Sequence, residues 1–513
     1  MKIIFRVDAF IKMGIGHVMR CLTLAHELKR SGSIITFVTS SDRGYIIPLI
    51  KSYGYDIETF NISRNGVTID EATEVDYDLW NNIFWKEDAE RTLQIAQKIQ
   101  PDLLIVDHYG LDAKWHQILR SATKKIMVID DLANRYLDCD LLLDQTFECT
   151  PRVYKDFTPS ECNFLVGTKY ALIRRDFIHL RQSAINKRKK EIEIRHILIS
   201  LGGSDTKNLT YQILKILEAM EWDVYPIVDV VLTKNSQYIE SIKAMANNAS
   251  LNINVLINVT HMAELMLKAD LAIGASGTTT WERCCLGLPS LVFGVSDNQK
   301  GILSKLDSLG AIVSLGCCTE FNGDLLSKEI VQIINNPSQY KSISKEAFTL
   351  CDGLGARWTY LAIQPIKAKD GKCVELREVT LDDSKMILKW QQMPEIRQYA
   401  KNPSIPTEEE HMRWMQEKIK ENFSYFWIIM HDKEPSGTLR LDNYGEKDYL
   451  ISIFVTPQKF GLGIGKGAIS VVQYLFEGIA NLSATILPEN TASLKLFESS
   501  GFIFDKEKKL FIW

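Results

Sequence analysis

The first part of the chain alternates short apolar runs with amphipathic stretches. The run Ile3–Val7 reads as a buried strand, and the apolar positions that follow it recur at helical spacing: Val18, Cys21, Leu22, Ala25 and Leu28. Further apolar runs, "SIITFVTS", "PDLLIVDHYG", "KKIMVIDDLA" and "CDLLLDQT", are interspersed with helical stretches such as "EDAERTLQIAQKIQ" and "DAKWHQILRSAT". Strands that alternate with helices predict a parallel sheet with both faces covered.

A second unit with the same pattern follows the charged segment "RQSAINKRKKEIEIR", which indicates a linker. In "HILISLGGSDTKNLTYQILKIL" a strand, a glycine turn and a helix again succeed one another. We therefore expect an α/β fold with two Rossmann-like domains, residues 1–185 and 190–365, in a GT-B arrangement. This layout places a ligand between the carboxyl ends of the strands of both domains.

The rest of the chain has a different order of elements, which predicts a third domain over residues 373–513. A strand, "VELREV", precedes helices at "DDSKMILKWQQM" and "TEEEHMRWMQEKIKE", and the strands "YFWIIMH", "PSGTLRLDN" and "DYLISIFVT" come next. A glycine loop, a helix, the strand "LSATIL" and a last helix complete it. This order predicts an α+β acyltransferase fold. Its tryptophans are expected in the core: Trp390, Trp414 and Trp427.

Length and composition limit the class of protein. A chain of 513 residues predicts two to four domains, and 46% hydrophobic with 24% charged residues is typical of a soluble globular protein. A formal net charge of -4 gives no reason to expect nucleic acid or a membrane as partner. The ten cysteines are dispersed without metal-ligand spacing, so we expect reduced thiols, a cytoplasmic enzyme and no metal. Homo-oligomerisation is left open.

A histidine follows the first glycine turn. Gly14, Gly16 and His17 lie between the first predicted strand and the first predicted helix. Amides at a helix start have no intrahelical partner and favour an anion, and a histidine beside them can exchange protons near neutral pH. The alternative is a surface histidine at a helix end. The glycines and the motifs downstream favour the functional interpretation.

The second unit contains two comparable turns. The first holds Gly202, Gly203 and Ser204, and the second runs through Ser276, Gly277 and Thr278 to Glu282. Small residues let the backbone approach a diphosphate, and a carboxylate can accept both hydroxyls of a ribose. The polar residues Asn298 and Gln299 are expected to line the same cleft. Ordinary strand-to-helix turns are the alternative explanation.

Four motifs carry a resemblance over residues 1 to about 365. In order, they are "GIGHVMRCLTLAHEL", "VDHYGLDAKW", "KYALIRRDF" and "GASGTTTWE". Together they resemble the UDP-2,4-diacetamido-2,4,6-trideoxy-β-L-altropyranose hydrolases of pseudaminic acid biosynthesis, metal-independent relatives of the MurG-type glycosyltransferases. The resemblance implies that water displaces UDP at the anomeric carbon with inversion.

The resemblance also implies roles for single residues. His17 matches the catalytic histidine and Glu282 the ribose-binding position. Asp107 and Tyr109 match the "DHYG" motif as candidate catalytic residues, with His108 as a candidate substrate contact. Because UDP is a good leaving group, the base that activates water is the main requirement, and His17 is the candidate.

The third domain carries a second resemblance, over about residues 373–513. The loop "FGLGIGKG" and the segment "NTASLKLFESSGF" resemble the GNAT acetyltransferases, in the branch that includes the pseudaminic-pathway N-acetyltransferase. Acetyl-CoA is the implied acyl donor, and a UDP-4-amino sugar the implied acceptor. The implied cofactor-binding residues are Val455, Gln458, Gly461, Gly463, Gly465, Lys466 and Asn490.

Two departures from that family concern its chemistry. Phe460 stands where the glycine motif usually begins with Gln or Arg, and Gln458 fits only if the motif is shifted. Phe497 replaces the tyrosine that protonates the departing thiolate, so solvent or another group must do so, or the domain is inactive. We expect a bifunctional enzyme that first acetylates and then hydrolyses a UDP-sugar. The alternatives are a glycosyltransferase with an acyltransferase appendage, and a third domain that only regulates.

Overall fold

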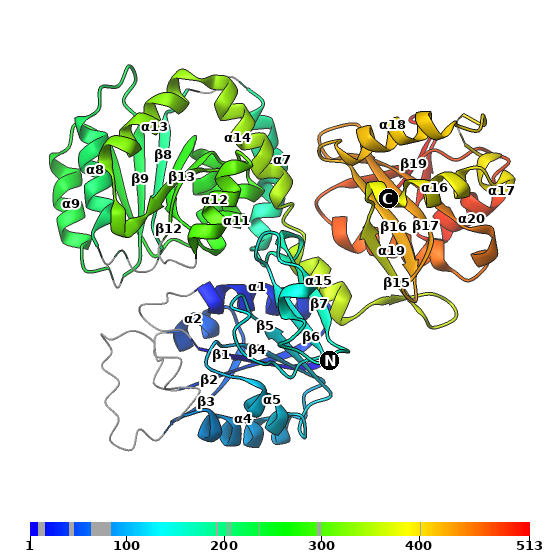
Figure 1. Cartoon of the computed structure of the whole chain (residues 1–513), viewed down its shortest axis with the longest axis horizontal. Coiled ribbons are helices and arrows are strands. Elements are labelled where there is room, and N and C mark those ends of the chain that lie inside the picture. Colours follow the sequence, from blue (N-terminus) through cyan, green and yellow to red (C-terminus); the bar gives the residue numbers. More distant parts are fainter. Residues whose placement is uncertain are drawn as a thin grey trace. The chain divides into compact units, whose positions relative to one another are not determined.

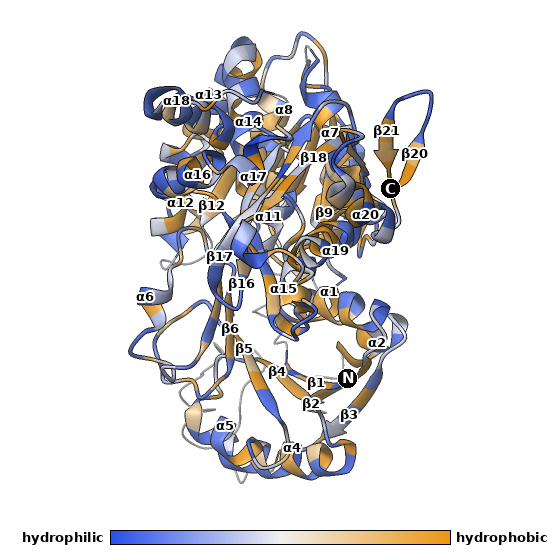
Figure 2. Ribbon diagram, turned by 90° about the vertical axis from the view of Figure 1, so that its right-hand side faces the viewer, coloured by the Kyte–Doolittle hydropathy of each residue, from blue (hydrophilic) through white to orange (hydrophobic). Residues whose placement is uncertain are grey.

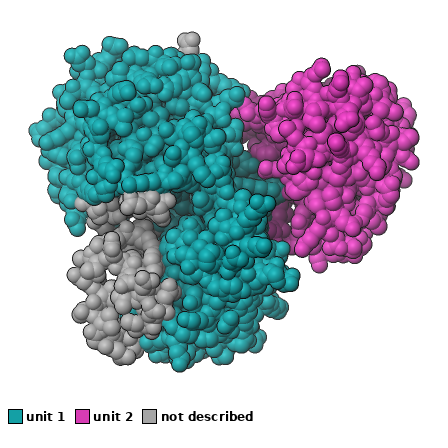
Figure 3. All heavy atoms as spheres, in the orientation of Figure 1, with its two compact units in different colours: residues 1–359 teal, residues 360–513 magenta. Residues whose placement is uncertain are grey.

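The computed structural model describes residues 1–8, 16–40, 46–62, 84–190, 193–202, 205, 207–234, 236–294, 299–400 and 402–513. The chain divides into two compact units, residues 1–359 and 360–513 (Figures 1 and 3). The first unit contains two parallel sheets and the second a mostly antiparallel one. No helix in these ranges combines the length and the apolar composition needed to cross a bilayer.

The first sheet has the strand order β3-β2-β1-β4-β5-β6-β7, and all its pairs are parallel. Its strands are β1 (Lys2–Val7), β2 (Ile34–Ser40), β3 (Asp56–Phe60), β4 (Leu103–Asp107), β5 (Lys125–Ile129), β6 (Leu141–Asp144) and β7 (Asn163–Val166). The strand order reverses between β1 and β4, where Val7 lies opposite Asp107. A crevice at the carboxyl ends of such a strand pair is the usual ligand position in this kind of sheet.

Helices cover both faces of this sheet. They are α1 (Gly16–Arg30), α2 (Ile46–Ser52), α4 (Trp85–Ile99), α5 (Ala113–Leu119) and α6 (Pro151–Tyr154). Helices α1 and α2 lie on one side and α4 and α5 on the other (Figure 1). Figure 2 shows hydrophobic and hydrophilic residues mixed along α4, as expected for a helix with one buried face. The side chains of Ile4, Leu104 and Trp115 are buried in the core beneath it.

The second sheet repeats this design with the order β10-β9-β8-β11-β12-β13, again all parallel. Its strands are β8 (His196–Ser200), β9 (Ile227–Leu232), β10 (Asn252–Ile257), β11 (Leu271–Ala275), β12 (Ser290–Gly294) and β13 (Val313–Cys317). Its helices are α8 (Leu209–Ala219), α9 (Ile239–Asn248), α10 (Met262–Lys268), α11 (Thr278–Cys285), α12 (Lys300–Ser308), α13 (Gly323–Asn335) and α14 (Pro337–Leu350), and α15 (Gly355–Ile363) follows. The order reverses between β8 and β11, so both predicted glycine turns of this half leave strands at one switch point.

The charged segment predicted as a linker is largely helical. Helix α7 (Arg175–Arg188) includes its first half and packs against the second sheet's helices. Arg181 donates to the carbonyl oxygens of Cys285 and Cys351 at 2.7 and 2.9 Å, and Arg188 donates to that of Ala269 at 2.8 Å. The segment connects the two sheets as predicted, but its first half is a packed helix, because these arginines bind carbonyl groups at the buried ends of other helices.

The second unit has an eight-stranded sheet in the order β14-β15-β16-β17-β18-β19-β21-β20. Its elements are β14 (Ile366–Lys367), β15 (Cys373–Glu378), α16 (Ser384–Gln391), α17 (Pro394–Arg397), α18 (Glu408–Ile419), β16 (Tyr425–His431), β17 (Glu434–Asn443), β18 (Asp448–Val455), α19 (Ile464–Phe476), β19 (Asn481–Ala484), α20 (Thr491–Ser499), β20 (Ile503–Asp505) and β21 (Leu510–Ile512). The parallel pair β18–β19 joins only Asp448–Leu450 to Asn481–Ser483. Beyond Leu450 these two strands are therefore unpaired with each other, and an opening lies between them.

Candidate active sites

The histidine predicted as a base lies at the switch point of the first sheet. His17 is in the first turn of α1, and Asp107 is the last residue of β4. His17 Nδ1 is 2.5 Å from Asp107 Oδ1, and the His17 side chain is only 9% exposed. The structure thus brings together two of the three predicted catalytic residues.

Arg20, one helical turn after His17, fixes the charge of this pair. Its Nε and Nη2 donate to the two carboxylate oxygens of Asp107 at 2.6 and 2.7 Å. Burial alone would raise the pKa of Asp107, but the charges of Arg20 and His17 outweigh burial and hold that pKa well below its ordinary value. An ionised Asp107 can only accept, so we assign the proton to His17 Nδ1, which leaves a lone pair on Nε2.

The third predicted catalytic residue lies beside the same ring. Tyr109 contacts His17 edge to face, with 4.7 Å between the ring centroids, and its hydroxyl donates to Asp131. Arg20 Nη1 also donates to Asp131, at 3.3 Å. Burial and the charge of Asp131 raise the pKa of Tyr109 well above its ordinary value, so the phenol stays protonated.

His108, predicted to contact substrate, belongs to a buried network instead of the His17 cluster. Its Nδ1 accepts from the backbone N–H of Gly110 at 3.0 Å, and its Nε2 lies 3.5 Å from Asp8. Burial lowers the pKa of His108, so the ring is neutral. Arg6 donates to Asp8 at 2.8 Å in the same network. These groups hold the end of β1 beneath the cleft.

The turn between β11 and α11 faces the start of α1. A side-chain Cβ on Gly16 would lie 3.9 Å from Thr278 Oγ1, so the two predicted turns are neighbours. Ser276 and Gly277 precede the helix, and Gly202 leaves β8 at the same switch point with φ +85°. The remaining predicted turn residues lie outside the described ranges: Gly14, Gly203, Ser204 and Asn298.

Glu282, predicted to bind ribose, is held by an arginine. Arg174 Nη2 is 3.2 Å from Glu282 Oε1, and Arg174 Nη1 donates to the carbonyl of Thr260 at 3.3 Å. Burial raises the pKa of Glu282 although Arg174 opposes the shift. Gln299 directly precedes α12. Arg174 connects the start of α7 to α11 and therefore positions the carboxylate.

The second unit contains a cavity of about 1780 Å³ at the opening between β18 and β19. Gly461 and Gly463 both have φ +79°, and Gly463 caps α19. These left-handed positions favour glycine and direct the turn's backbone along the cavity wall. The other predicted residues that line the cavity are Val455, Gly465, Lys466 and Asn490.

Two residues of this unit differ from their predicted places. Gln458 lies in the short 3-10 helix Pro457–Lys459 and does not line the cavity. Trp414, expected in the core, is partly exposed and lines the cavity beside Arg440, whose guanidinium carbon is 5.4 Å from its ring centroid. Asn490 also caps α20, accepting from the Ser493 N–H at 3.0 Å.

Phe497 stands at the cavity wall without an ionisable group. It is 3% exposed, and its ring packs edge to face on Phe502 with 4.9 Å between centroids. A phenyl ring cannot protonate a thiolate.

The described residues include no cluster of three or more histidine, cysteine or acidic side chains arranged to hold a metal.

Sequence reasoning missed three functional candidates: Arg20, Asp131 and Arg174. Arg20 follows His17 at one helical turn, a spacing that indicates a shared face. Asp131 follows an apolar run, as residues at the carboxyl end of a strand do. Arg174 belongs to the motif "KYALIRRDF", and nothing in its sequence surroundings indicates a role for this residue.

Comparison with known proteins identifies the two parts of the chain. Residues 374–503 match the family model described as "Acetyltransferase (GNAT) domain". Acetyltransferase PseH of Campylobacter jejuni is 24% identical over 144 residues, which span 27% of this chain and 90% of that protein. The UDP-2,4-diacetamido-2,4,6-trideoxy-beta-L-altropyranose hydrolase of Campylobacter jejuni is 28% identical over 278 residues, 54% of this chain and 85% of that protein.

Two further similarities concern the architecture. An uncharacterized protein of Methanocaldococcus jannaschii is 26% identical over 98% of this chain and 96% of its own length. The crystal structure of Acinetobacter baumannii MurG superimposes with a TM-score of 0.51 at 14% identity, covering 71% of this chain and all but 1% of MurG. The chain thus joins a GT-B unit similar to UDP-sugar hydrolases with a GNAT acetyltransferase domain, as the sequence predicted.

Proposed function

We propose that the chain acts twice on one nucleotide sugar of the pseudaminic acid type. The second unit transfers an acetyl group from acetyl-CoA to the 4-amino group of a UDP-4-amino-4,6-dideoxy sugar. The first unit then hydrolyses the resulting UDP-2,4-diacetamido-2,4,6-trideoxy-β-L-altropyranose to free sugar and UDP. The similarity to proteins named for these two kinds of activity supports the pairing.

In the hydrolase unit, His17 Nε2 takes a proton from the attacking water. Asp107 accepts from Nδ1 and stabilises the imidazolium that forms, while Arg20 holds both oxygens of Asp107 in place. Charge develops on the departing diphosphate, which the N-terminal amides of α11 stabilise beside Thr278. Glu282 receives the ribose hydroxyls.

In the acetyltransferase unit, the backbone amides around Gly461, Gly463 and Gly465 hold the diphosphate of acetyl-CoA. The acceptor amine attacks the thioester carbonyl and loses a proton to solvent as the amide forms, and the carbon–sulfur bond breaks to release the CoA thiolate. Phe497 supplies no proton, so solvent protonates the thiolate. The half of the cavity around Trp414 and Arg440 receives the acceptor sugar.

One observation carries the hydrolase proposal: His17, Asp107 and Arg20 form a hydrogen-bonded group at a switch point, facing the turn before α11. In this arrangement Asp107 sets the tautomer of the base, His17, and the N-terminus of α11 offers an anion site on the opposite side. A base beside a diphosphate site is what water attack on a UDP-sugar requires.

The test is an NMR time course with the intact chain, the UDP-4-amino sugar and acetyl-CoA. We expect the acetamide signal first and then free sugar with UDP. His17→Asn should stop the second step and leave the first unchanged. UDP release that occurs only when a sugar acceptor is added would identify a glycosyltransferase and contradict the hydrolase assignment.

A further inference from the structure

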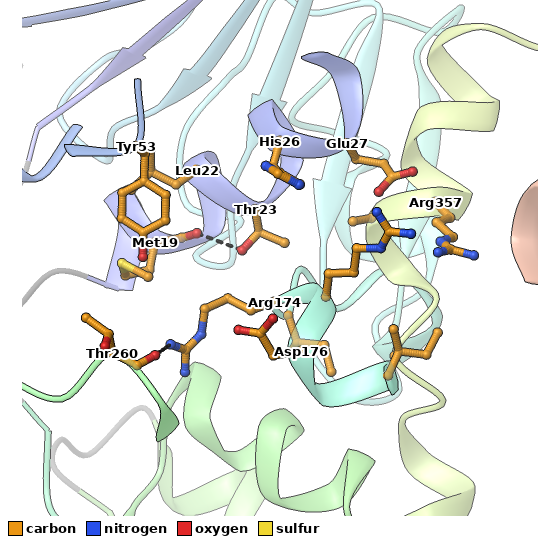
Figure 4. Close-up of a pocket in the computed structure, with 15 residues that line it drawn as sticks. Met19, Leu22, Thr23, His26, Glu27, Tyr53, Arg174, Asp176, Thr260 and Arg357 are labelled. Atoms are coloured by element: carbon orange, nitrogen blue, oxygen red, sulfur yellow. Dashed lines mark hydrogen bonds between the residues drawn. The ribbon is translucent and has the colours of Figure 1, made fainter. Parts of the chain in front are cut away.

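A small cavity of about 160 Å³ lies beside α1 in the first unit. Figure 4 shows Met19, Thr23 and His26 of α1 facing Arg174 at the start of α7 across this space. We call it the α1 pocket. Its wall also includes Arg175 and Arg357.

The wall of the α1 pocket includes none of His17, Arg20 and Asp107. Successive residues of an α-helix are rotated by about 100°, so Thr23 and His26 point away from His17 and Cys21. Cys21 Sγ lies 3.4 Å from Asp107, on the catalytic side of the helix. The α1 pocket therefore does not include the cluster around Asp107, and it shares only Arg174 with the surroundings of Glu282.

Cationic side chains outnumber carboxylates in the wall of the α1 pocket. Its arginines are Arg174, Arg175 and Arg357, and its carboxylates are Glu27 and Asp176. Glu27 is already paired with Arg30 at 2.7 Å, which lies outside the wall.

Arg175 is the group that this wall leaves unsatisfied. Its Nε is buried and has no hydrogen-bond partner among the described residues. A buried guanidinium nitrogen without a partner is costly, and buried polar groups of this kind are normally paired. Arg175 also lines the cavity, so an anion bound there would give its guanidinium an acceptor.

The volume restricts what this anion is. Sites for drug-sized ligands occupy roughly 300–1,000 Å³, so a cavity of about 160 Å³ is too small for a whole UDP-sugar. The apolar side chains of Leu22, Ile173 and Ile178 also line it. A guanidinium binds a carboxylate or phosphate strongly, because its planar N–H groups match two oxygens.

We propose that the α1 pocket binds a small oxyanion, a phosphate or a carboxylate group, through Arg175. The site goes beyond the two proposed activities. Its wall combines α1 of the first sheet with Thr260, which follows β10 of the second, and with both connecting segments. Binding therefore stabilises the first unit by joining parts of both halves.

The experiment measures the thermal midpoint of the intact chain with inorganic phosphate or acetate, at constant ionic strength kept with sodium chloride. We expect one of the two anions to raise the midpoint, and the stronger one identifies the preferred oxyanion. Arg175→Leu should weaken this anion about tenfold or more, because it removes a charged hydrogen-bond donor. Arg152→Leu, at an exposed arginine of α6, is the matched control and should respond as wild type.

Arg175→Lys keeps the charge without the planar donor pair and should bind at least about threefold more weakly than wild type, even if the leucine variant is unstable. UDP is tested in parallel and should stabilise Arg175→Lys as it does wild type, which separates this site from the nucleotide site. The proposal is overturned if neither anion shifts the wild-type midpoint, or if both Arg175 variants respond as wild type does.

Discussion

Arg20 and Asp107 form a two-point ion pair, in which Nε and Nη2 donate to both carboxylate oxygens at 2.6 and 2.7 Å. Both side chains are buried, and the histidine proposed as base shares the same carboxylate. In the proposed mechanism Arg20 keeps Asp107 ionised and the ring of His17 in one tautomer, which makes it a positioning residue.

The His17→Asn variant should lose hydrolysis and keep acetyl transfer. A positioned base contributes about 10²–10⁴-fold to a rate, so UDP release should fall by that factor. The release of free CoA thiol by the same preparation is the internal control. Hydrolysis at the wild-type rate would show that His17 is not the base.

The Arg20→Leu variant should shift the acid limb of the hydrolysis pH profile upward. Without the guanidinium, the largest opposing charge to burial is gone and the pKa of Asp107 rises. Since protonated Asp107 no longer accepts from His17, activity is lost at a higher pH than in wild type. The measurement is the pH profile of kcat/KM for UDP release, taken for each variant over roughly pH 4 to 8. An unchanged acid limb would contradict the positioning role.

Gly463→Ala should impair acetyl-CoA binding selectively. The residue has φ +79°, which strains any other residue, and an added Cβ would lie 2.8 Å from Lys369 Cγ, so the turn or the Lys369 side chain must shift. We expect KM for acetyl-CoA to rise about tenfold, since an alanine in this conformation costs about 1–2 kcal/mol and displaces the amides. Gly371→Ala is the matched control, because Gly371 has φ +82° with open space around it and does not line the cavity.

Phe497→Tyr should speed acetyl transfer. The new hydroxyl would place a proton donor at the cavity wall, and a positioned acid contributes about 10²-fold or more where thiolate protonation limits the rate. Phe502→Tyr, at the ring that packs on Phe497, is the control and should give no gain. Equal rates for wild type and Phe497→Tyr would indicate that protonation by solvent is already fast.

His116 should make the first unit less stable in mild acid. Its side chain is fully buried in α5, and burial lowers its pKa from 6.5 to about 3. As the pH falls, the unfolded chain binds the proton before the folded chain does. The contribution of neutral His116 to the free energy of unfolding is therefore complete above pH 6.5 and is lost as the pH falls toward 3, at up to about 1.4 kcal/mol per pH unit.

Urea unfolding at about pH 7.5 and about pH 5 measures this loss of unfolding free energy. His116→Leu should lose less stability between these pH values than wild type. His261→Leu, at an exposed histidine, should behave as wild type. The same pH dependence in His116→Leu as in wild type would contradict the assignment.

The elements themselves were largely predictable, because periodicity is a local property of the chain. The apolar run "YFWIIMH" coincides with β16, and "SIITFVTS" with β2 apart from its first residue. Polar or very short strands escaped prediction: the edge strand β3, with the sequence DIETF, and the three-residue strands β20 and β21. Edge strands bury little surface, so their sequences carry little of the signal.

The sequence by itself determined that a glycine turn precedes α1 and α11 and that His17 stands at a helix start, since turn and helix signals depend on neighbouring residues. Glu282 lies one turn further into its helix than predicted. Only the tertiary structure decided which side chains meet. Strand order places Asp107 beside His17 but directs the adjacent His108 into a buried network with Asp8. The contact of His17 with Asp107 joins residues 90 positions apart, and no local pattern encodes which of two neighbouring side chains will face the cleft.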